Sequence, residues 1–141
     1  LANAICAINN KDNFIILDFG TATTFDVVLK NRYKGGIIAP GVNLSLKTLI
    51  EKAKLIPNTK LKKIKNIIGK NTQNAVKSGF YWGYQGLIKN LINLIEKKNK
   101  KKFKIIFTGG LSHLYKNTIK KKIKVDKDLT IKGLLKLVVT E

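Results

Sequence analysis

Near its start the chain reads Leu17-Asp18-Phe19-Gly20-Thr21-Ala22-Thr23-Thr24-Phe25-Asp26, with an apolar run before this stretch and a β-rich run at its end. Residues 14–17 and 25–29 have the composition of strands, and the glycine and hydroxyl residues between them indicate a tight turn. Glycine lets a backbone approach a ligand closely, and N–H groups and hydroxyls donate hydrogen bonds without bulk. Asp18 adds a carboxylate that can hold a cation beside a phosphate. The stretch therefore predicts a β-hairpin that binds a phosphate chain.

The rest of the chain continues this hairpin into a single α/β domain. With 141 residues, the chain is long enough to bury a core of its own. Apolar spacing, glycines and prolines place the other elements. They are the end of a helix over 1–10, a strand over 33–39, a helix over 42–54, an irregular lysine-rich connection over 55–68, a long helix from Asn71 or Thr72 to Glu96, a strand over 104–107, a short helix to Lys116, and a final helix, or a helix and a strand, over 129–137.

The long helix carries glycines where helices usually avoid them. Gly79, Gly83 and Gly86 share one face, which predicts close packing of that face against another helix or a ligand. Tyr81, Trp82 and Tyr84 lie among these glycines and suit either a packed interface or a platform for a base. The apolar stripe of this helix is predicted to consist of Val76, Phe80, Leu87, Leu91, Leu94 and Ile95.

The net charge of +20 raises the question of nucleic-acid binding. Arg32 is the only arginine, however, and arginine is the preferred residue for base and bidentate phosphate recognition. We therefore expect a solvated basic surface and no specific nucleic-acid partner, with a basic nucleic-acid-binding module as an alternative. No run reaches transmembrane length and the first residues do not form a signal peptide. Cys6 is the single cysteine, which suits a reducing cytoplasm.

Several separated motifs stand in the order found in type III pantothenate kinases, and the chain resembles this family over nearly its whole length. Beside the opening Asp18-to-Thr24 motif these are Gly35-Gly36-Ile37-Ile38-Ala39-Pro40-Gly41, Ile68-Gly69-Lys70-Asn71-Thr72, Ser78-Gly79-Phe80-Tyr81-Trp82-Gly83-Tyr84, Thr108-Gly109-Gly110-Leu111 and Asp128-Leu129-Thr130-Ile131-Lys132-Gly133-Leu134. The resemblance implies an actin-like ATPase half domain of the ribonuclease-H-like class, with a mixed sheet and flanking helices. It also implies ATP-dependent phosphorylation of pantothenate, the first step of coenzyme A synthesis.

Two motifs that the resemblance implies do not occur in this sequence. They are a first phosphate-binding DxGNT turn and a GxDR motif with the catalytic aspartate, which directly precedes a stretch like Leu1-Ala2-Asn3-Ala4. The resemblance is therefore to the C-terminal half of the enzyme. Residues 1–12 are expected to be the tail of a helix from an N-terminal domain, and residues 13–141 the C-terminal actin-like domain. We expect no catalytic base in this chain and no kinase activity from it alone.

The resemblance also assigns ligands to particular residues. Asp18 would bind a monovalent cation, potassium or ammonium, and Thr21 would bind ATP, which carries Mg²⁺. Gly20 and Thr23 would add contacts to the phosphates, Gly109 and Gly110 would border the adenosine, and Thr72 would contact pantothenate. The region of Tyr81 and Trp82 would lie near a homodimer contact.

Each assignment has a simpler alternative in the sequence. Asp18 suits a strand end, Thr23 and Thr24 suit a strand, Gly109 and Gly110 suit a plain turn, and Thr72 suits a helix cap. Asp26 either faces solvent or orders the phosphate loop. For the whole protein, the rival functions are a non-catalytic accessory or regulatory relative of these kinases and another kinase of the same superfamily.

Overall fold

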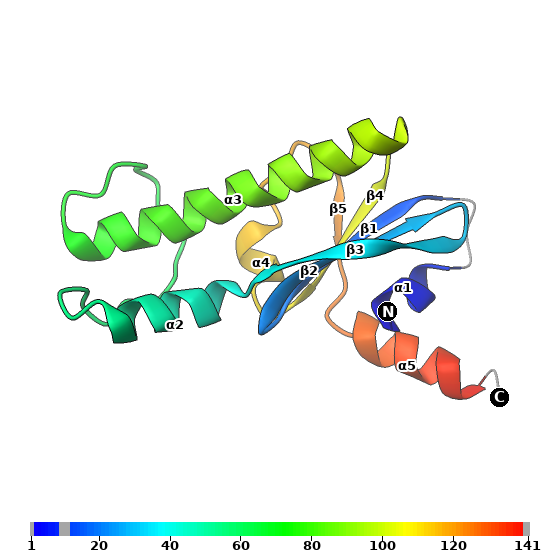
Figure 1. Ribbon diagram of the computed structural model, residues 1–141, viewed down its shortest axis with the longest axis horizontal. Helices are drawn as coiled ribbons and strands as arrows, with labels where there is room; N and C mark the ends of the chain where they lie inside the picture. The colour runs from blue at the N-terminus through cyan, green and yellow to red at the C-terminus, as the bar shows by residue number, and fades with distance from the viewer. Residues whose placement is uncertain (1, 9–11, 140–141) are drawn as a thin grey trace.

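A five-stranded mixed sheet forms the centre of the computed structural model, which describes residues 2–8 and 12–139 (Figure 1). The strand order is β3-β2-β1-β4-β5. β1 pairs antiparallel with β2 and parallel with β4; β2–β3 is antiparallel and β4–β5 parallel. The strands are β1 (Phe14–Phe19), β2 (Ala22–Leu29), β3 (Arg32–Pro40), β4 (Lys104–Gly109) and β5 (Ile123–Val125).

Helices lie on both sides of this sheet. α3 runs along one face, and α1 and α5 pack together on the other (Figure 1). The helices are α1 (Ala2–Ala7), α2 (Val42–Lys52), α3 (Thr72–Asn99), α4 (Ser112–Tyr115) and α5 (Leu129–Val139). The predicted mixed sheet with flanking helices is confirmed. None of the helices in residues 2–8 and 12–139 combines the length and apolar character needed to cross a lipid bilayer.

The alternation of side chains along β1 divides the core into two layers. Ile15, Leu17 and Phe19 are buried on the side of α3, whereas Phe14 and Ile16 are buried on the side of α1. The alternation places Asp18 on the α1 side. β2 follows the same rule, because Asp18 pairs with Thr24 and Phe19 pairs with Thr23.

α1 packs directly against the sheet of this domain. Ala4 and Ala7 are buried there with Ile16 and Val28. A Cβ atom placed on Gly133 of α5 would lie 1.9 Å from the carbonyl oxygen of Ala2, so glycine is what lets α1 and α5 meet at backbone contact. The boundary at residue 12 stays a prediction, and the predicted helix stop at Asn9-Asn10 lies outside the described residues.

α3 begins and ends close to its predicted limits. Asn71 is the N-cap, since its side chain accepts a hydrogen bond of 2.8 Å from the N–H of Asn74. The predicted apolar stripe was wrong in part: Ile95 is buried, but Leu94 is 51% exposed. The helix is apolar over a wide arc, and its inward side also takes polar residues. The buried positions are Ser78, Tyr81, Gln85, Ile88, Ile92, Ile95 and Glu96.

Glu96 is a buried carboxylate near the end of α3. It accepts a hydrogen bond of 3.0 Å from the N–H of Phe103 and bonds the ammonium groups of Lys121 and Lys102. Burial alone would raise the pKa of Glu96, but the Lys121 and Phe103 hydrogen bonds and both lysine charges outweigh it and lower the pKa. The ionised carboxylate therefore stabilises the loops that follow α3 and α4.

Glu96→Gln should lower the free energy of unfolding near neutral pH by about 1 kcal/mol. Glutamine can still accept from Phe103 but loses the attraction of the two lysines. Because the folded-state pKa is lowered, this stabilisation is present above the usual value of 4.5 and disappears as pH falls through the lowered pKa. Urea unfolding at several pH values measures it. An equal difference between the two proteins at pH 7 and at pH 3 would contradict the assigned ionisation.

Candidate functional site

The carboxyl ends of the two parallel strands β1 and β4 meet at one edge of the sheet. Asp18 lies beside Thr108, and Phe19 lies beside Gly109. Gly20 and Thr21 form the turn between β1 and β2, where the Gly20 N–H donates to the carbonyl of Ala22 over 3.1 Å. Ligands of open α/β sheets bind outside the carboxyl ends of such strands. The turn and the Gly109-Gly110 segment therefore border one candidate binding edge.

Gly109 is the residue that allows these two segments to approach. Its φ of +89° lies in the left-handed region, and a Cβ atom there would stand 2.6 Å from the Phe19 carbonyl oxygen and 2.8 Å from Oδ1 of Asp18. No heavy atom lies within 4 Å of a Cβ built on Gly110. Gly109 is thus required by the backbone, whereas the space beside Gly110 is open to a ligand.

The start of α2 packs against the turn. A Cβ atom on Gly41 would lie 2.0 Å from the carbonyl oxygen of Thr21, so the backbones of the two segments are in direct contact. Tyr84 of α3 donates to the carbonyl of Pro40 over 3.0 Å and lies 3.3 Å from the hydroxyl of Ser45. α3 therefore fixes the start of α2, and α2 fixes the turn.

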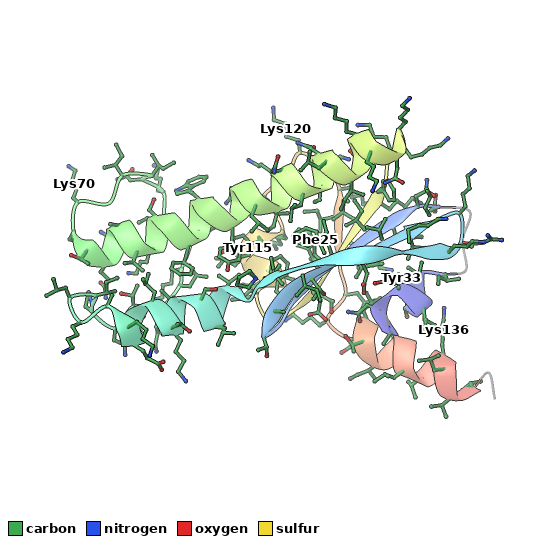
Figure 2. The ribbon with its side chains drawn as sticks, in the orientation of Figure 1. Phe25, Tyr33, Lys70, Tyr115, Lys120 and Lys136 are labelled. Atoms are coloured by element: carbon green, nitrogen blue, oxygen red, sulfur yellow. The ribbon has the colours of Figure 1, made fainter. Side chains whose placement is uncertain are left out.

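An aromatic cluster packs against Phe19 at the same edge, on the α3 side of the sheet. Tyr115 of α4 stacks on Phe19 at 5.4 Å between ring centroids and on Tyr81 at 6.0 Å (Figure 2 labels Tyr115). Its hydroxyl donates to the Phe80 carbonyl over 3.1 Å. Burial raises the pKa of Tyr115, and the neighbouring phenols raise it further, so it remains a neutral donor. The aromatic residues of α3 thus pack within this chain.

A polar cavity of about 390 Å³ opens on the α1 side of the sheet, and Asp18 lines it. Oδ2 of Asp18 accepts a hydrogen bond of 2.9 Å from the amide of Asn3. The other amide atom of Asn3 accepts from the Thr130 hydroxyl over 2.7 Å. The remaining lining residues are Ala2, Thr24, Asp26, Tyr33, Gly36, Ile37 and Ile38.

Asp26 forms the second acidic group of this cavity. It is 8% exposed, and its Oδ1 accepts a hydrogen bond of 3.1 Å from the Tyr33 hydroxyl. Partial burial raises the pKa of Tyr33, and the Asp26 carboxylate raises it further, so the phenol keeps its proton. Asp26 therefore faces the cavity. The first of its two predicted interpretations, that it faces solvent, was wrong.

The two carboxylate oxygens of Asp18 have different surroundings. Oδ2 accepts a hydrogen bond from Asn3, whereas Oδ1 lies close to Gly109, 2.8 Å from where a Cβ atom on that glycine would stand. A carboxylate with backbone carbonyls nearby suits a large, weakly hydrated ion. The residues described hold no group of three or more His, Cys, Asp or Glu side chains that could bind a metal on their own.

The structure brings together five of the seven predicted site residues. Asp18, Gly20, Thr21, Gly109 and Gly110 lie at the same edge of the sheet.

Thr23 and Thr72 lie apart from that group. The side chain of Thr23 is fully buried on the α3 side, where its hydroxyl has no hydrogen-bond partner among the described residues. Thr72 is exposed at the first turn of α3, beyond the sheet (Figure 1), and does not line the Asp18 cavity.

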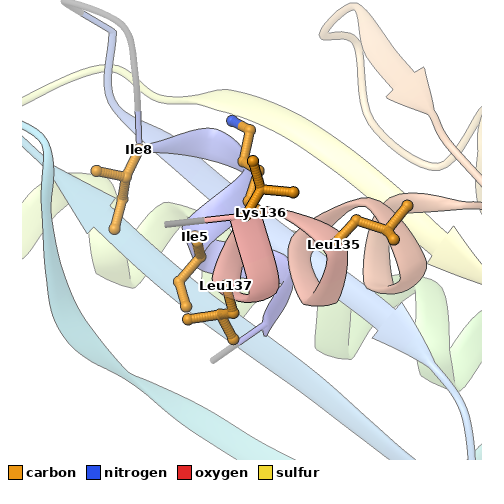
Figure 3. Close-up of a pocket in the computed structure, with 6 residues that line it drawn as sticks. Ile5, Ile8, Leu135, Lys136 and Leu137 are labelled. Carbon is orange, nitrogen blue, oxygen red and sulfur yellow. The ribbon is translucent and has the colours of Figure 1, made fainter. Parts of the chain in front are cut away.

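Two of the cavities that are larger than this one lack its combination of groups. One lies between α1 and α5 (Figure 3) and is lined by aliphatic side chains, with Lys136 as its single charged residue. The other, of about 720 Å³, lies between α2 and residues 58–61 and reaches Leu111, next to Gly110. The second is a neighbour of the candidate edge, whereas the first offers no converging polar groups.

Comparison with known proteins gives concordant matches. A family model described as "Type III pantothenate kinase" matches residues 1–94. A type III pantothenate kinase of Pelagibacter ubique (strain HTCC1062) is 65% identical over 136 residues, which cover 96% of this chain and 55% of the relative. The chain spans about half the length of the curated relatives that it matches.

Solved structures share the fold. A conserved Baf family protein from Campylobacter jejuni has a TM-score of 0.68 at 24% identity, covering 99% of this chain and 63% of that one. The Alp12 filament structure has a TM-score of 0.62 at 19% identity, covering 99% of this chain and 52% of that one. These likenesses show the fold alone, which is the predicted actin-like architecture.

Proposed function

Because this chain belongs to the type III pantothenate kinase family, we propose that it is the nucleotide-binding part of an enzyme that phosphorylates pantothenate. The enzyme would transfer the γ-phosphoryl group of ATP to the primary hydroxyl of pantothenate, giving 4'-phosphopantothenate, the first intermediate of coenzyme A synthesis. One observation carries the proposal: the Gly20–Thr21 turn and the Gly109–Gly110 segment border one edge of the sheet beside Asp18. The lone Cys6 suits a cytoplasmic enzyme.

The residues of this edge would bind and orient the nucleotide. The N–H group and hydroxyl of the exposed Thr21 would donate to the phosphates, while the open side of Gly110 would admit the adenosine. Asp18 would hold a monovalent cation, and that cation, with the Mg²⁺ of ATP, would neutralise phosphate charge. For Thr23, burial leaves a structural role as the simpler assignment.

We assign no residue of this chain as the catalytic base. Phosphoryl transfer depends mainly on positioning and charge stabilisation, together with one group that accepts the proton of the attacking hydroxyl. The aspartate that the family resemblance implies for that role is not in this sequence, and Asp18 and Asp26 are engaged by Asn3 and Tyr33. Residues 1–141 alone should therefore form no phosphopantothenate. Robust turnover by them would contradict this division of roles.

The test of the function is phosphorylation of pantothenate by the complete protein, followed as ADP release that depends on pantothenate. Thr72→Ala should raise the apparent KM for pantothenate about tenfold, the value of one hydrogen bond, and change the KM for ATP little. Asn71 still caps α3 in this variant, so the helix keeps its start. Thr72→Ser, which keeps the hydroxyl, is the control. A larger effect on the KM for ATP would move Thr72 to the nucleotide side.

We also propose that α3 forms a homodimer contact through its outer face. Gly79, Gly83 and Gly86 are exposed opposite the buried side, and no atom of the described residues lies within 4 Å of a Cβ built on any of them. Glycines cost helix stability, so a row of three on an open face is expected where a second backbone approaches closely. Leu94, 51% exposed, extends this face.

Gly83→Leu should convert the dimer into a monomer, because the larger side chain keeps the second backbone away. The helix itself should gain stability, since leucine is a better helix former than glycine. Sedimentation equilibrium and circular dichroism measure the two effects. Lys89→Leu, which adds the same side chain elsewhere on the exposed surface of α3, should leave the dimer intact. A Gly83→Leu protein with an unchanged dimer would exclude this face.

A further inference from the structure

Lysine-rich segments occur in several parts of this chain, and one of them spans the end of α3 and the start of β4. Eleven lysines and one acidic residue, Glu96, lie between residues 96 and 125. In sequence these lysines form two main runs, one at the end of α3 and one between α4 and β5.

The fold brings the two lysine runs together. Glu96 bonds Lys121 of the second run and lies 3.5 Å from the ammonium of Lys102 of the first. Figure 2 shows Lys120 on the same side of the molecule as the last turns of α3. We call this surface the lysine face: Lys97, Lys98, Lys100, Lys101, Lys102, Lys120, Lys121 and Lys122.

Most of the charge on the lysine face is available to a partner. Among the described residues, Lys102 and Lys121 are the members of the face that bind a carboxylate, and both bind the same one. All members except Lys121 are exposed. A cavity of about 370 Å³ lies within the face and is lined by Asn93, Glu96 and four of the lysines. This cavity offers no apolar side chain.

Lys100 occupies a backbone position that disfavours it. Its φ of +49° makes it the left-handed C-cap of α3, a conformation that glycine adopts freely and that costs other residues about 1 kcal/mol or more. A lysine here places a further positive charge at the most exposed turn of the face, at a cost in folding free energy. The position also offers a substitution that removes charge without harming the fold.

The lysine face is remote from the candidate nucleotide edge. β4 begins at Lys104 beside the face and ends at Gly109 beside Asp18. Its six residues span about 20 Å of extended chain. The face therefore cannot contact phosphates held at the Gly20–Thr21 turn, and its charge requires a different anion.

We propose that the lysine face binds the phosphate backbone of nucleic acid without reading its sequence. Lysine ammonium groups are mobile point charges that suit phosphate oxygens in many registers, whereas base recognition relies on arginine forks. Arg32, the single arginine, stands at the start of β3. Eight lysines from the end of α3 and from two converging loops provide the repeated charge that a polyphosphate chain requires. An anionic lipid surface would attract the same charges, but the cavity in the face supplies no apolar side chain to insert between lipids.

The test is fluorescence anisotropy of the complete protein with a labelled 20-base-pair DNA and a labelled 20-nucleotide RNA, each in two unrelated sequences, across a range of salt concentrations. The face variant is Lys98→Gln, Lys101→Gln, Lys120→Gln and Lys122→Gln together. The matched control removes the same charge from exposed lysines elsewhere, as Lys54→Gln, Lys62→Gln, Lys63→Gln and Lys65→Gln. Lys100→Gly is a third variant, which removes one charge and suits the left-handed cap.

The face variant should lose about tenfold or more in affinity near 0.1 M salt, and the slope of log K against log salt should fall by about 3. The affinity of the control should change little, because charges more than about 10 Å apart are largely screened from each other at this salt concentration. Lys100→Gly should weaken binding at unchanged or greater stability. Equal losses in the face variant and the control, or tight binding to anionic phosphatidylserine vesicles with none to nucleic acid, would overturn the proposal.

Discussion

Replacing Gly109 by alanine should abolish nucleotide binding and lower the free energy of unfolding by about 2–4 kcal/mol. Alanine is strained at a φ of +89°. Its Cβ atom would also meet the backbone of Phe19 at 2.6 Å and the Asp18 carboxylate at 2.8 Å. Since backbone atoms cannot move aside as a flexible side chain would, β1 and β4 must separate at the candidate edge. Urea unfolding and ATP titration followed by calorimetry measure both effects.

Gly110→Ala is the matched control for this prediction. The two glycines are adjacent, but a Cβ on Gly110 meets no heavy atom within 4 Å. The free energy of unfolding of the Gly110→Ala protein should therefore change by about 0.5 kcal/mol or less. Any loss of its ATP affinity would report direct contact of residue 110 with the nucleotide. If the Gly109→Ala protein kept both its stability and its ATP affinity, the close approach of β4 to Asp18 would be refuted.

Asp18→Asn should lower the kcat/KM of the complete enzyme about a hundredfold and remove its dependence on potassium. Asparagine has the shape of aspartate and can still accept the hydrogen bond from Asn3, so the fold should be preserved. The lost quantity is the negative charge that would hold the cation. Initial rates in potassium, in ammonium and without either ion measure the prediction.

Asp12→Asn provides the control for charge alone. Asp12 pairs with Lys104 at a distance of 2.6 Å, at the other end of the sheet, so its loss should leave the ion dependence unchanged. An Asp18→Asn enzyme with the potassium dependence of the unmodified protein would show that the cation binds elsewhere.

Most of the sheet could be predicted because the residues of each longer strand have the local composition of a strand. Residues 14–17 form an apolar run, a glycine and hydroxyl residues follow, and residues 25–29 are rich in strand-forming residues; the structure forms a hairpin there. β5 escaped prediction because its three residues, Ile123–Val125, give no periodicity among lysines. The inward side of α3 was misjudged for a different reason: Ser78, Gln85 and Glu96 are buried, and a pattern of apolar residues cannot reveal buried polar positions.

The candidate site was predictable only where its residues adjoin in sequence or follow parallel strands. Gly20, Thr21 and Gly109 could be assigned to one edge from their motifs. Asn3 could not, because its contact with Asp18 crosses from a helix to a strand and exists only after folding. The period of two along β2 could have separated Thr24, which shares the face of Asp18, from the buried Thr23.

Asn3 joins two parts of the molecule that the chain keeps far apart. Its amide bonds Asp18 at the candidate edge through one atom and Thr130 at the start of α5 through the other. Thermodynamic linkage makes such a connection reciprocal. A ligand at Asp18 that strengthens the hydrogen bond from Asn3 must raise the protection of α5 amides against hydrogen exchange. Conversely, a change that stabilises α5 must raise the affinity of the Asp18 site for that ligand. α5, whose Thr130 lines the same cavity as Asp18, thereby becomes a reporter of occupancy at that site.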